Sequence, residues 1–394
     1  MTDRPSAEYI ALIAALIAIG ALGTDIMLPA LAQIGMDLNA PSANDVHYIV
    51  TAFFLGMAVG QIFVGPLSDA VGRKPVIYGG YIVFVAGCLV SIFGGTWEAM
   101  LAGRMLQGLG ASTPRIVTVA LVRDQYAGAP MARVMSIVMA AFIAVPILAP
   151  MLGQVLVTLG DWQACFVGLI VLAIAVSLWC AVRLPETLAP EARRTFRAAP
   201  LLAGLREVLR SRPVMGYTLA TALNFGMFLG YLGSAQQIFA EVFGRGASFV
   251  LYFALAAASI GVAALINARL VERLGMARLT WAAQVGAAGV SIVFLAVLIP
   301  YAGVPPFWSF VAWQLAAFFC VGVLFGNLNA LALEPLGHMP GLGAAFTGAL
   351  SMLLSLPLAA HISGAFDGTV WPLVAGFAGL SATALPVLRW AARR

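Results

Sequence analysis

Charged residues are scarce in this sequence. Asp, Glu, Lys and Arg make up only 9% of the 394 residues, whereas 62% of the residues are hydrophobic. A water-soluble domain carries roughly a quarter charged residues, and a folded chain of this length could not hide so much apolar surface from water. The low charge therefore excludes a soluble globular protein and makes the lipid bilayer the expected solvent. The formal net charge of +5 then indicates membrane orientation rather than nucleic-acid binding.

Cysteine and histidine are also rare. The four cysteines lie in apolar runs without metal-ligand spacing, which favours small core residues over a disulfide framework or a metal site. They are Cys88, Cys165, Cys180 and Cys320. The three histidines are scattered, so no metal is expected. The sequence has no glycine loop for phosphate, which argues against ATP-driven transport, and no His–Glu motif or Ser/His/Asp set, which argues against an intramembrane enzyme. We expect no cofactor.

Long apolar runs dominate what is present. A membrane-spanning helix needs about 20 mostly apolar residues, and twelve such runs follow one another along the chain. They cover residues 9–30, 46–66, 75–93, 97–121, 134–157, 163–182, 214–240, 249–270, 279–300, 306–333, 342–363 and 370–390. The runs are continuous rather than alternating, which favours helices over a β-barrel. The first run is too long for the core of a cleavable signal peptide, so we expect it to remain as the first span.

The basic residues indicate the topology. With the N-terminus in the cytoplasm, 18 of the 21 Lys and Arg residues fall on the cytoplasmic side, that is, all except Arg104, Arg115 and Arg245. One missed span would invert every later loop, so this bias supports the span count. We therefore expect both termini in the cytoplasm.

A polar stretch divides the twelve runs six and six. This stretch is rich in Arg, Pro, Glu and Thr, and residues 201–210 within it are a candidate surface helix. A weak repeat supports two halves, because residues 69–72 and 272–275 both place an acidic residue three positions before a glycine, after the second span of each half. The predicted divisions are an N-terminal six-helix bundle (1–183), a cytoplasmic linker (184–212) and a C-terminal six-helix bundle (213–394).

The most specific motif lies at residues 65–77. They read Gly-Pro-Leu-Ser-Asp-Ala-Val-Gly-Arg-Lys-Pro-Val-Ile and closely resemble the major facilitator superfamily signature Gly-x-Leu-x-Asp-Arg-x-Gly-Arg-Lys, which lies between the second and third spans. Ala70 departs from the usual arginine. The resemblance implies an all-α integral membrane fold of the major facilitator type, with twelve transmembrane helices in two six-helix bundles.

This motif can be explained physically as a gate. Gly65 and Gly72 allow a tight turn, and Asp69 can accept hydrogen bonds at the start of the next helix and attract nearby basic residues. The alternative is a solvated, charged turn that only fixes topology. The predicted gating residues are Gly65, Asp69, Gly72, Arg73, Lys74, Arg123 and Asp124.

Other stretches resemble the twelve-helix drug/proton antiporter branch, especially the bicyclomycin/chloramphenicol/florfenicol resistance group. They are residues 24–31, 104–111, 123–126 and 184–188. In the fifth span the antiporter element is partial, since Pro146, Pro150 and Gly153 are present but Ala149 and Gln154 replace glycines.

The resemblance to this branch implies proton-coupled secondary active efflux of small drug-like molecules by alternating access. It implies a monomer in the bacterial inner membrane, with a small-molecule substrate, protons and lipid as its partners and no nucleic acid. The alternatives are a dedicated exporter of one endogenous metabolite, such as a siderophore, sugar or amino-acid derivative, and a proton-linked importer.

Asp25 is the acidic residue that lies deepest in a predicted span. An ionised carboxylate there is costly unless it is paired, which makes it a natural proton carrier. Asp25 and Arg104 both lie about 8–10 Å below the outer membrane face at about 1.5 Å per helical residue. We therefore predict that Asp25 and Arg104 carry proton coupling; the alternative is a structural ion pair.

Arg115 follows Arg104 by eleven residues, so both side chains fall on nearly the same face of one helix. An arginine facing lipid is costly, so this face should line a cavity and Arg115 should bind an anionic or carbonyl-rich ligand; the alternative is a second structural contact. In the second half we predict amides and an aromatic residue as ligand contacts, although amides also join helices. The predicted substrate-binding residues are Arg115, Asn224, Tyr231, Gln236 and Asn327.

Overall fold

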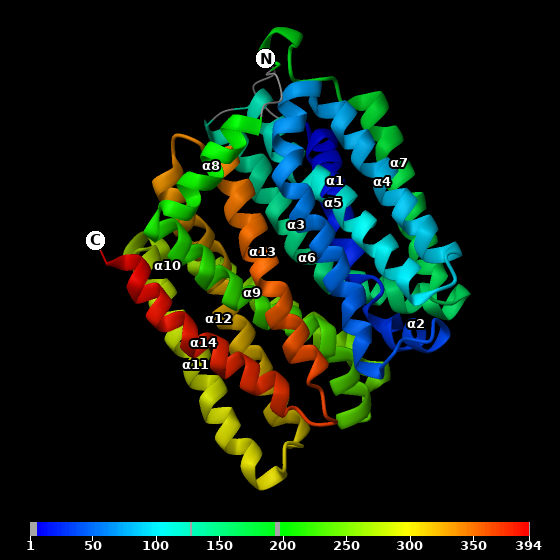
Figure 1. The fold of residues 1–394 in the computed structure, drawn as a ribbon, viewed down its shortest axis with the longest axis vertical. Helices are drawn as coiled ribbons and strands as arrows, with labels where there is room; N and C mark the ends of the chain where they lie inside the picture. Colours follow the sequence, from blue (N-terminus) through cyan, green and yellow to red (C-terminus); the bar gives the residue numbers. More distant parts are fainter. Residues whose placement is uncertain (1–5, 127, 194–197, 394) are drawn as a thin grey trace. The chain divides into compact units, whose positions relative to one another are not determined.

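The structure is a computed structural model that describes residues 6–126, 128–193 and 198–393, and its regular elements in these ranges are helices (Figure 1). The first seven are α1 (Ala7–Asp25), α2 (Leu31–Asp37), α3 (His47–Val71), α4 (Arg73–Phe93), α5 (Trp97–Gln125), α6 (Gly128–Gly160) and α7 (Gln163–Arg183). The others are α8 (Ala198–Arg210), α9 (Arg212–Gln237), α10 (Phe249–Leu274), α11 (Met276–Leu298), α12 (Phe307–Leu333), α13 (Pro340–Gly364) and α14 (Trp371–Ala392).

Each of the twelve predicted spans coincides with one of the long helices, of which α1 is the shortest at 19 residues. The two short helices, α2 and α8, lie between spans. Within the described ranges, nine helical segments are long and apolar enough to cross a membrane by length and composition. The all-α class and the order of the spans are thus confirmed. Four of the basic residues used to predict topology, Arg4, Arg194, Arg197 and Arg394, lie outside the described residues.

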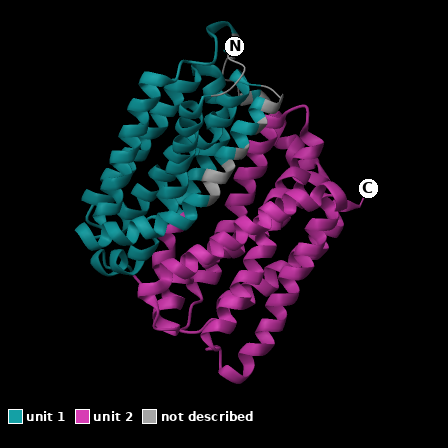
Figure 2. Ribbon diagram, turned by 180° about the vertical axis from the view of Figure 1, so that it is seen from behind, with its two compact units in different colours: residues 1–40, 52–199 teal, residues 41–51, 200–394 magenta. Residues whose placement is uncertain are grey.

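The chain divides into two compact units (Figure 2). Unit 1 comprises Met1–Ala40 and Ala52–Ala199, and unit 2 comprises Pro41–Thr51 and Pro200–Arg394. The short segment Pro41–Thr51, which leads into α3 and includes its first residues, belongs to unit 2. Its Asn44 amide donates to the carbonyl oxygens of Gly364 at 3.1 Å and Phe366 at 2.8 Å, which fixes the segment to the end of α13.

Glycines allow the helices of unit 1 to pack with their backbones in contact. A Cβ atom on Gly108 of α5 would overlap the carbonyl oxygen of Phe53 in α3, and one on Gly87 of α4 would press against the backbone of Gly103 and Gln107 in α5. Small residues drive helix association in lipid in this way, because close backbones gain van der Waals contact where no hydrophobic force operates. The resulting α3–α5–α4 layer holds α5, with its two arginines, in a fixed position.

The first span is broken where the sequence predicted a continuous helix to residue 30. Helix α1 ends at Asp25, and a 3-10 turn (Leu28–Ala30) leads into α2. The cause is Pro29, whose ring in a continuous helix would clash with the carbonyl group four residues earlier, that of Asp25. Asp25 is therefore the last residue of a helix in the interior of unit 1. The segment beyond the break is anchored by Asp37, whose carboxylate accepts the indole N–H of Trp162 at 2.9 Å.

Candidate functional site

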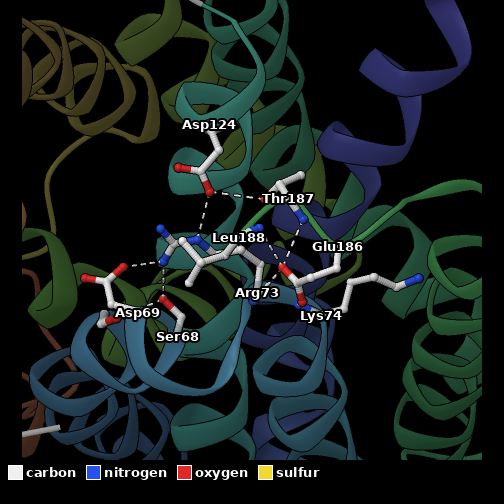
Figure 3. A network of polar contacts seen from close by, with 9 residues as sticks. Ser68, Asp69, Arg73, Lys74, Asp124, Glu186, Thr187 and Leu188 are labelled. Atoms are coloured by element: carbon white, nitrogen blue, oxygen red, sulfur yellow. Dashed lines mark hydrogen bonds and ion pairs between the residues drawn. The ribbon is translucent and has the colours of Figure 1, made fainter. Parts of the chain in front are cut away.

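Arg73 is the centre of a polar network at one end of unit 1 (Figure 3). Its side chain is buried, and its guanidinium donates from Nη1 to Asp69 Oδ1 at 2.5 Å and to Ser68 Oγ at 2.8 Å, and from Nε to Asp124 Oδ2 at 2.9 Å. Asp124 also accepts the hydroxyl of Thr187 at 3.1 Å. A guanidinium held by two carboxylates makes strong, directional hydrogen bonds. This Arg73 network therefore joins the ends of α3 and α5 to the start of α4 and to the chain that follows α7.

Glu186 adds a second attachment to the same point. Its carboxylate accepts the backbone N–H groups of Arg73 and Lys74, each at 3.0 Å, and those of Thr187 and Leu188 at 2.9 and 3.0 Å. The first two are the free N–H groups at the N-terminus of α4, where the helix dipole favours an anion. Burial acts to raise the pKa of Glu186, but the four N–H bonds outweigh burial and hold this pKa below its ordinary value.

The structure places the predicted gating residues in three ways. The side chains of Asp69, Arg73 and Asp124 meet next to Gly72, whose positive φ of 119° makes the turn between α3 and α4. Lys74 joins them through its backbone N–H, while its ammonium donates to the Ala181 carbonyl oxygen at 3.4 Å. Gly65 lies inside α3, so the prediction that it forms part of the turn is wrong; the helix continues through Pro66 to Val71. Arg123 is exposed in the last turn of α5. Their transport roles stay predictions.

Sequence reasoning assigned no role to Ser68, Glu186 and Thr187. Glu186 lies in residues 184–188, a stretch that resembles the resistance group. The resemblance indicated this segment but not that it contacts the N-terminus of α4. At the repeat in the second half, Gly275 also has a positive φ, of 79°, at the start of α11. Among the described residues, no carboxylate binds the first N–H groups of α11 as Glu186 binds those of α4. The two halves are thus similar in backbone and different in chemistry.

Asp25 and Arg104 come together in the interior of unit 1. Asp25 is 5% exposed and Arg104 is fully buried, and their opposite charges interact. Arg104 Nη1 also donates to the Gly23 carbonyl oxygen at 2.9 Å, two residues before Asp25, and its guanidinium carbon lies 4.5 Å from the centre of the Phe53 ring. An arginine bonded to the chain that carries Asp25 is held beside that carboxylate. This is the proximity that the matching depths predicted.

Two polar residues that were not predicted hold Arg104 from the other side. Gln107 Oε1 accepts from Arg104 Nη1 at 2.6 Å, and Gln107 Nε2 donates to Ser91 Oγ at 3.0 Å. Gln107 and Ser91 are both buried, and they link α5 to α4. Buried polar chains of this kind fix side-chain orientation because each unmade bond is costly. Gln107 lies in residues 104–111, a stretch that resembles the resistance group, so this resemblance could have indicated Gln107 as a site residue.

Arg115 has a different environment from Arg104. Its side chain is exposed, and Nη1 contacts Met57 Sδ at 3.8 Å. Because Phe53 and Met57 lie one turn apart on α3, both arginines of α5 point toward the same helix. The guanidinium group of Arg104 is buried, whereas that of Arg115 is accessible to a ligand.

Three of the four predicted binding residues of unit 2 are bonded to other helices. Asn224 of α9 donates to Gln284 of α11 at 2.9 Å, and Gln314 of α12 donates to the hydroxyl of Tyr231 in α9 at 2.8 Å. Asn327 of α12 exchanges two hydrogen bonds with Asn267 of α10, at 2.9 and 3.0 Å. Gln236 is half-buried near the end of α9. These contacts favour helix–helix bonding over direct ligand contact.

Comparisons with known proteins agree with this architecture. Residues 11–360 match the family described as the Major Facilitator Superfamily. The chain is 27% identical over 361 residues to Multidrug resistance protein D of Escherichia coli, covering 91% of this chain and 89% of that protein. It is 26% identical over 359 residues to the Bicyclomycin resistance protein homolog of Haemophilus influenzae, covering 89% and 88%. Among solved structures, a D-xylose-proton symporter shares the fold with a TM-score of 0.76 at 13% identity, covering 98% of both chains.

The chain belongs to the major facilitator superfamily. It is a multi-pass membrane protein that transports small molecules and not an enzyme, as predicted. The predicted resemblance to the bicyclomycin resistance group is confirmed by the relatives.

Proposed function

We propose that the protein exports small drug-like molecules by alternating access in exchange for protons. The observation that carries this proposal is the buried Asp25, which ends a broken span beside Arg104 in a chain of transporter fold. The resistance proteins among its relatives support a drug-like substrate. The location that fits is a bacterial inner membrane, with both termini in the cytoplasm and the monomer as the working unit.

Proton exchange at Asp25 would change the charge balance around Arg104. When Asp25 is ionised, the carboxylate and the guanidinium balance each other in the apolar interior. When Asp25 takes up a proton, the cation of Arg104 loses the charge of this carboxylate, while its bonds to Gly23 and Gln107 and its contact with the Phe53 ring are neutral. The two protonation states thus favour different arrangements of α1 and α5, which a transporter can use to couple proton movement to opening.

The Arg73 network supports alternating access because it concentrates several charge-assisted bonds at one point. Its charge-assisted bonds hold the ends of α3 and α5, the start of α4 and the segment after α7 in one arrangement. Movement of any of these helices must break several bonds together, which favours two discrete states over gradual deformation. We propose that the network stabilises one end state of the transport cycle and does not bind substrate.

Arg115 is the residue that we propose for substrate contact. An exposed guanidinium on a membrane-spanning helix requires water or an anionic partner, because lipid contact is costly. This feature favours a second candidate function, the dedicated export of one anionic endogenous metabolite. Competition between chemically diverse compounds in the same transport assay separates this function from multidrug export.

The test is transport by the purified protein in liposomes with an imposed pH gradient. We expect a fluorescent cationic or neutral drug to be concentrated on the side with the higher proton concentration, and dissipation of the gradient to abolish this accumulation. Movement in the same direction as protons would identify an importer. Accumulation that is independent of the pH gradient would contradict proton coupling. Liposomes with the double variant Asp25→Asn, Arg104→Gln are the matched control.

A further inference from the structure

Helix α8 presents three different faces around its axis. Gly204 lies against Phe346 and Leu342 of α13, and Val208 is fully buried, so this face of α8 packs inward, toward α13 (Figure 1). Leu202 and Leu209 are 66% and 51% exposed. They are seven residues apart and therefore form one apolar stripe beside the buried face.

The next stripe around the helix is basic. Arg206 and Arg210 are exposed, lie one turn apart and follow the leucine stripe at about 40–80° around the axis. Together with Ala203 and Ser211 they line an open hollow. Glu207 also lines this hollow, and its carboxylate contacts Nε2 of His338 at 2.8 Å, so it has a partner other than the arginines.

The residues that follow α8 mark the level of the lipid headgroups. Helix α9 begins at Arg212, one residue after the hollow ends, and is the first predicted span of the second half. The Arg212 guanidinium donates to the carbonyl oxygen of Trp390 at 2.8 Å and lies 5.5 Å from its ring centre. Arg389 lies 4.9 Å from the ring centre of Trp281 in the same way. Tryptophan and arginine gather at membrane–water interfaces, where the apolar ring and the charge both find a suitable environment.

We propose that α8 lies in the membrane interface and binds anionic phospholipid. The leucine stripe enters the boundary of the acyl chains, and Arg206 and Arg210 hold the phosphate of a phosphatidylglycerol-type headgroup in the hollow. A helix with leucines on one side and arginines on the adjacent side is the pattern of interfacial helices. Arg212 and Trp390 place the two leucines at the level of the lipid headgroups. A bilayer therefore fits these leucines better than a protein partner does.

Native mass spectrometry of the full-length protein tests the binding of lipid. The protein in detergent is titrated with phosphatidylglycerol or with phosphatidylcholine. We expect Arg206→Gln with Arg210→Gln to weaken phosphatidylglycerol binding about thirtyfold, at about fivefold for each arginine near an anionic surface, and to leave phosphatidylcholine unchanged. The matched control is Arg273→Gln with Arg278→Gln, which removes two exposed arginines, one from the end of α10 and one from the start of α11. It should change phosphatidylglycerol binding by less than about threefold.

A second measurement tests the position of the leucine stripe. An environment-sensitive fluorophore is attached at Leu202→Cys, and the labelled protein is placed in nanodiscs of phosphatidylcholine or of an equal mixture with phosphatidylglycerol. We expect the emission spectrum to report an apolar environment, with a larger shift in the mixture than in phosphatidylcholine alone. The proposal is overturned if the fluorophore reports water in both lipids, if the control pair weakens binding as much as the α8 pair, or if inorganic phosphate binds at α8 as tightly as the lipid.

Discussion

The Glu186 carboxylate accepts the backbone N–H of Arg73 at 3.0 Å, across 113 positions of sequence. The same carboxylate binds the N–H of Lys74, so the segment after α7 serves as the N-terminal cap of α4. Arg73 is at once the residue whose backbone Glu186 caps and the residue whose side chain binds Asp69 and Asp124. One arginine thereby connects four segments of unit 1.

Neutralising Glu186 should weaken this attachment. In Glu186→Gln the anion at the helix N-terminus is lost, which should lower the stability of the Arg73 network by about 1 kcal/mol and slow transport while substrate binding persists. Because the pKa of Glu186 lies below its ordinary value of 4.5, its contribution is fully present above that pH and is lost as the pH falls further, through the lowered pKa. Melting temperatures of wild type and Glu186→Gln should therefore converge in strong acid. Equal differences at all pH values would contradict this assignment.

Gly72 offers a test with a matched control in the second half. Both Gly72 and Gly275 have positive φ, so alanine at either position should cost about 1 kcal/mol in backbone strain. A Cβ on Gly72 would also lie 2.8 Å from Glu186 Oε2, whereas one on Gly275 would meet open space. We expect both variants to lose melting temperature, Gly72→Ala more than Gly275→Ala because it also disturbs Glu186, and we expect a large loss of transport only in Gly72→Ala. Equal transport losses would show that backbone strain alone, and not contact with Glu186, matters at this turn.

Asp69→Asn should separate gating from binding. The change removes one carboxylate from Arg73 and leaves Asp124 in place, so the network should be weakened rather than abolished. We expect transport to fall at least about tenfold while ligand affinity changes by less than about twofold, because in our proposal the network stabilises one conformation and does not bind substrate. Ligand affinity is measured by thermal shift or fluorescence with the same compounds as in the flux assay. Parallel losses of affinity and flux would place Asp69 in the binding site instead.

Arg115→Lys should change which substrates are transported. Lysine keeps the charge but replaces a planar, forked donor by a point charge, so carbonyl-rich and anionic compounds should lose about tenfold in transport efficiency relative to neutral compounds. Proton coupling should survive, because Arg104 is untouched. The readout is the ratio of rates for two substrates rather than one rate. An unchanged ratio together with a lower melting temperature would assign Arg115 to structure, through its contact with Met57.

The sequence predicted the spans well because length and hydrophobicity control insertion into lipid. The break after Asp25 could also have been predicted from the sequence, because Pro29, four residues later, is incompatible with a continuous helix there. The proximity of Asp25 and Arg104 followed from their similar depth in the membrane. The attachment of Glu186 could not be predicted, because two loops far apart in sequence share no periodicity that would reveal their contact.

Buried amides show the same limit. Asn224 and Asn327 in spans of the second half could equally bind a ligand or a neighbouring helix, and only the rotation of each helix decides. The structure turns Asn224 toward Gln284 and Asn327 toward Asn267. The sequence pattern shows which residues share one face of a helix. Which other helix that face contacts depends on the tertiary packing.

Concentrative transport by the Asp25→Asn variant tests the central claim most directly. Asparagine imitates the protonated carboxylate, so the variant should bind neutral substrate and exchange it down its gradient at rates near those of wild type. It should fail to concentrate substrate when a pH gradient is imposed on the same liposomes, where wild type succeeds. If Asp25→Asn still concentrates substrate against its gradient at a pH-dependent rate, the proton carrier lies elsewhere. The next residues to test are then His361, in the last turn of α13, and Glu334, directly after α12.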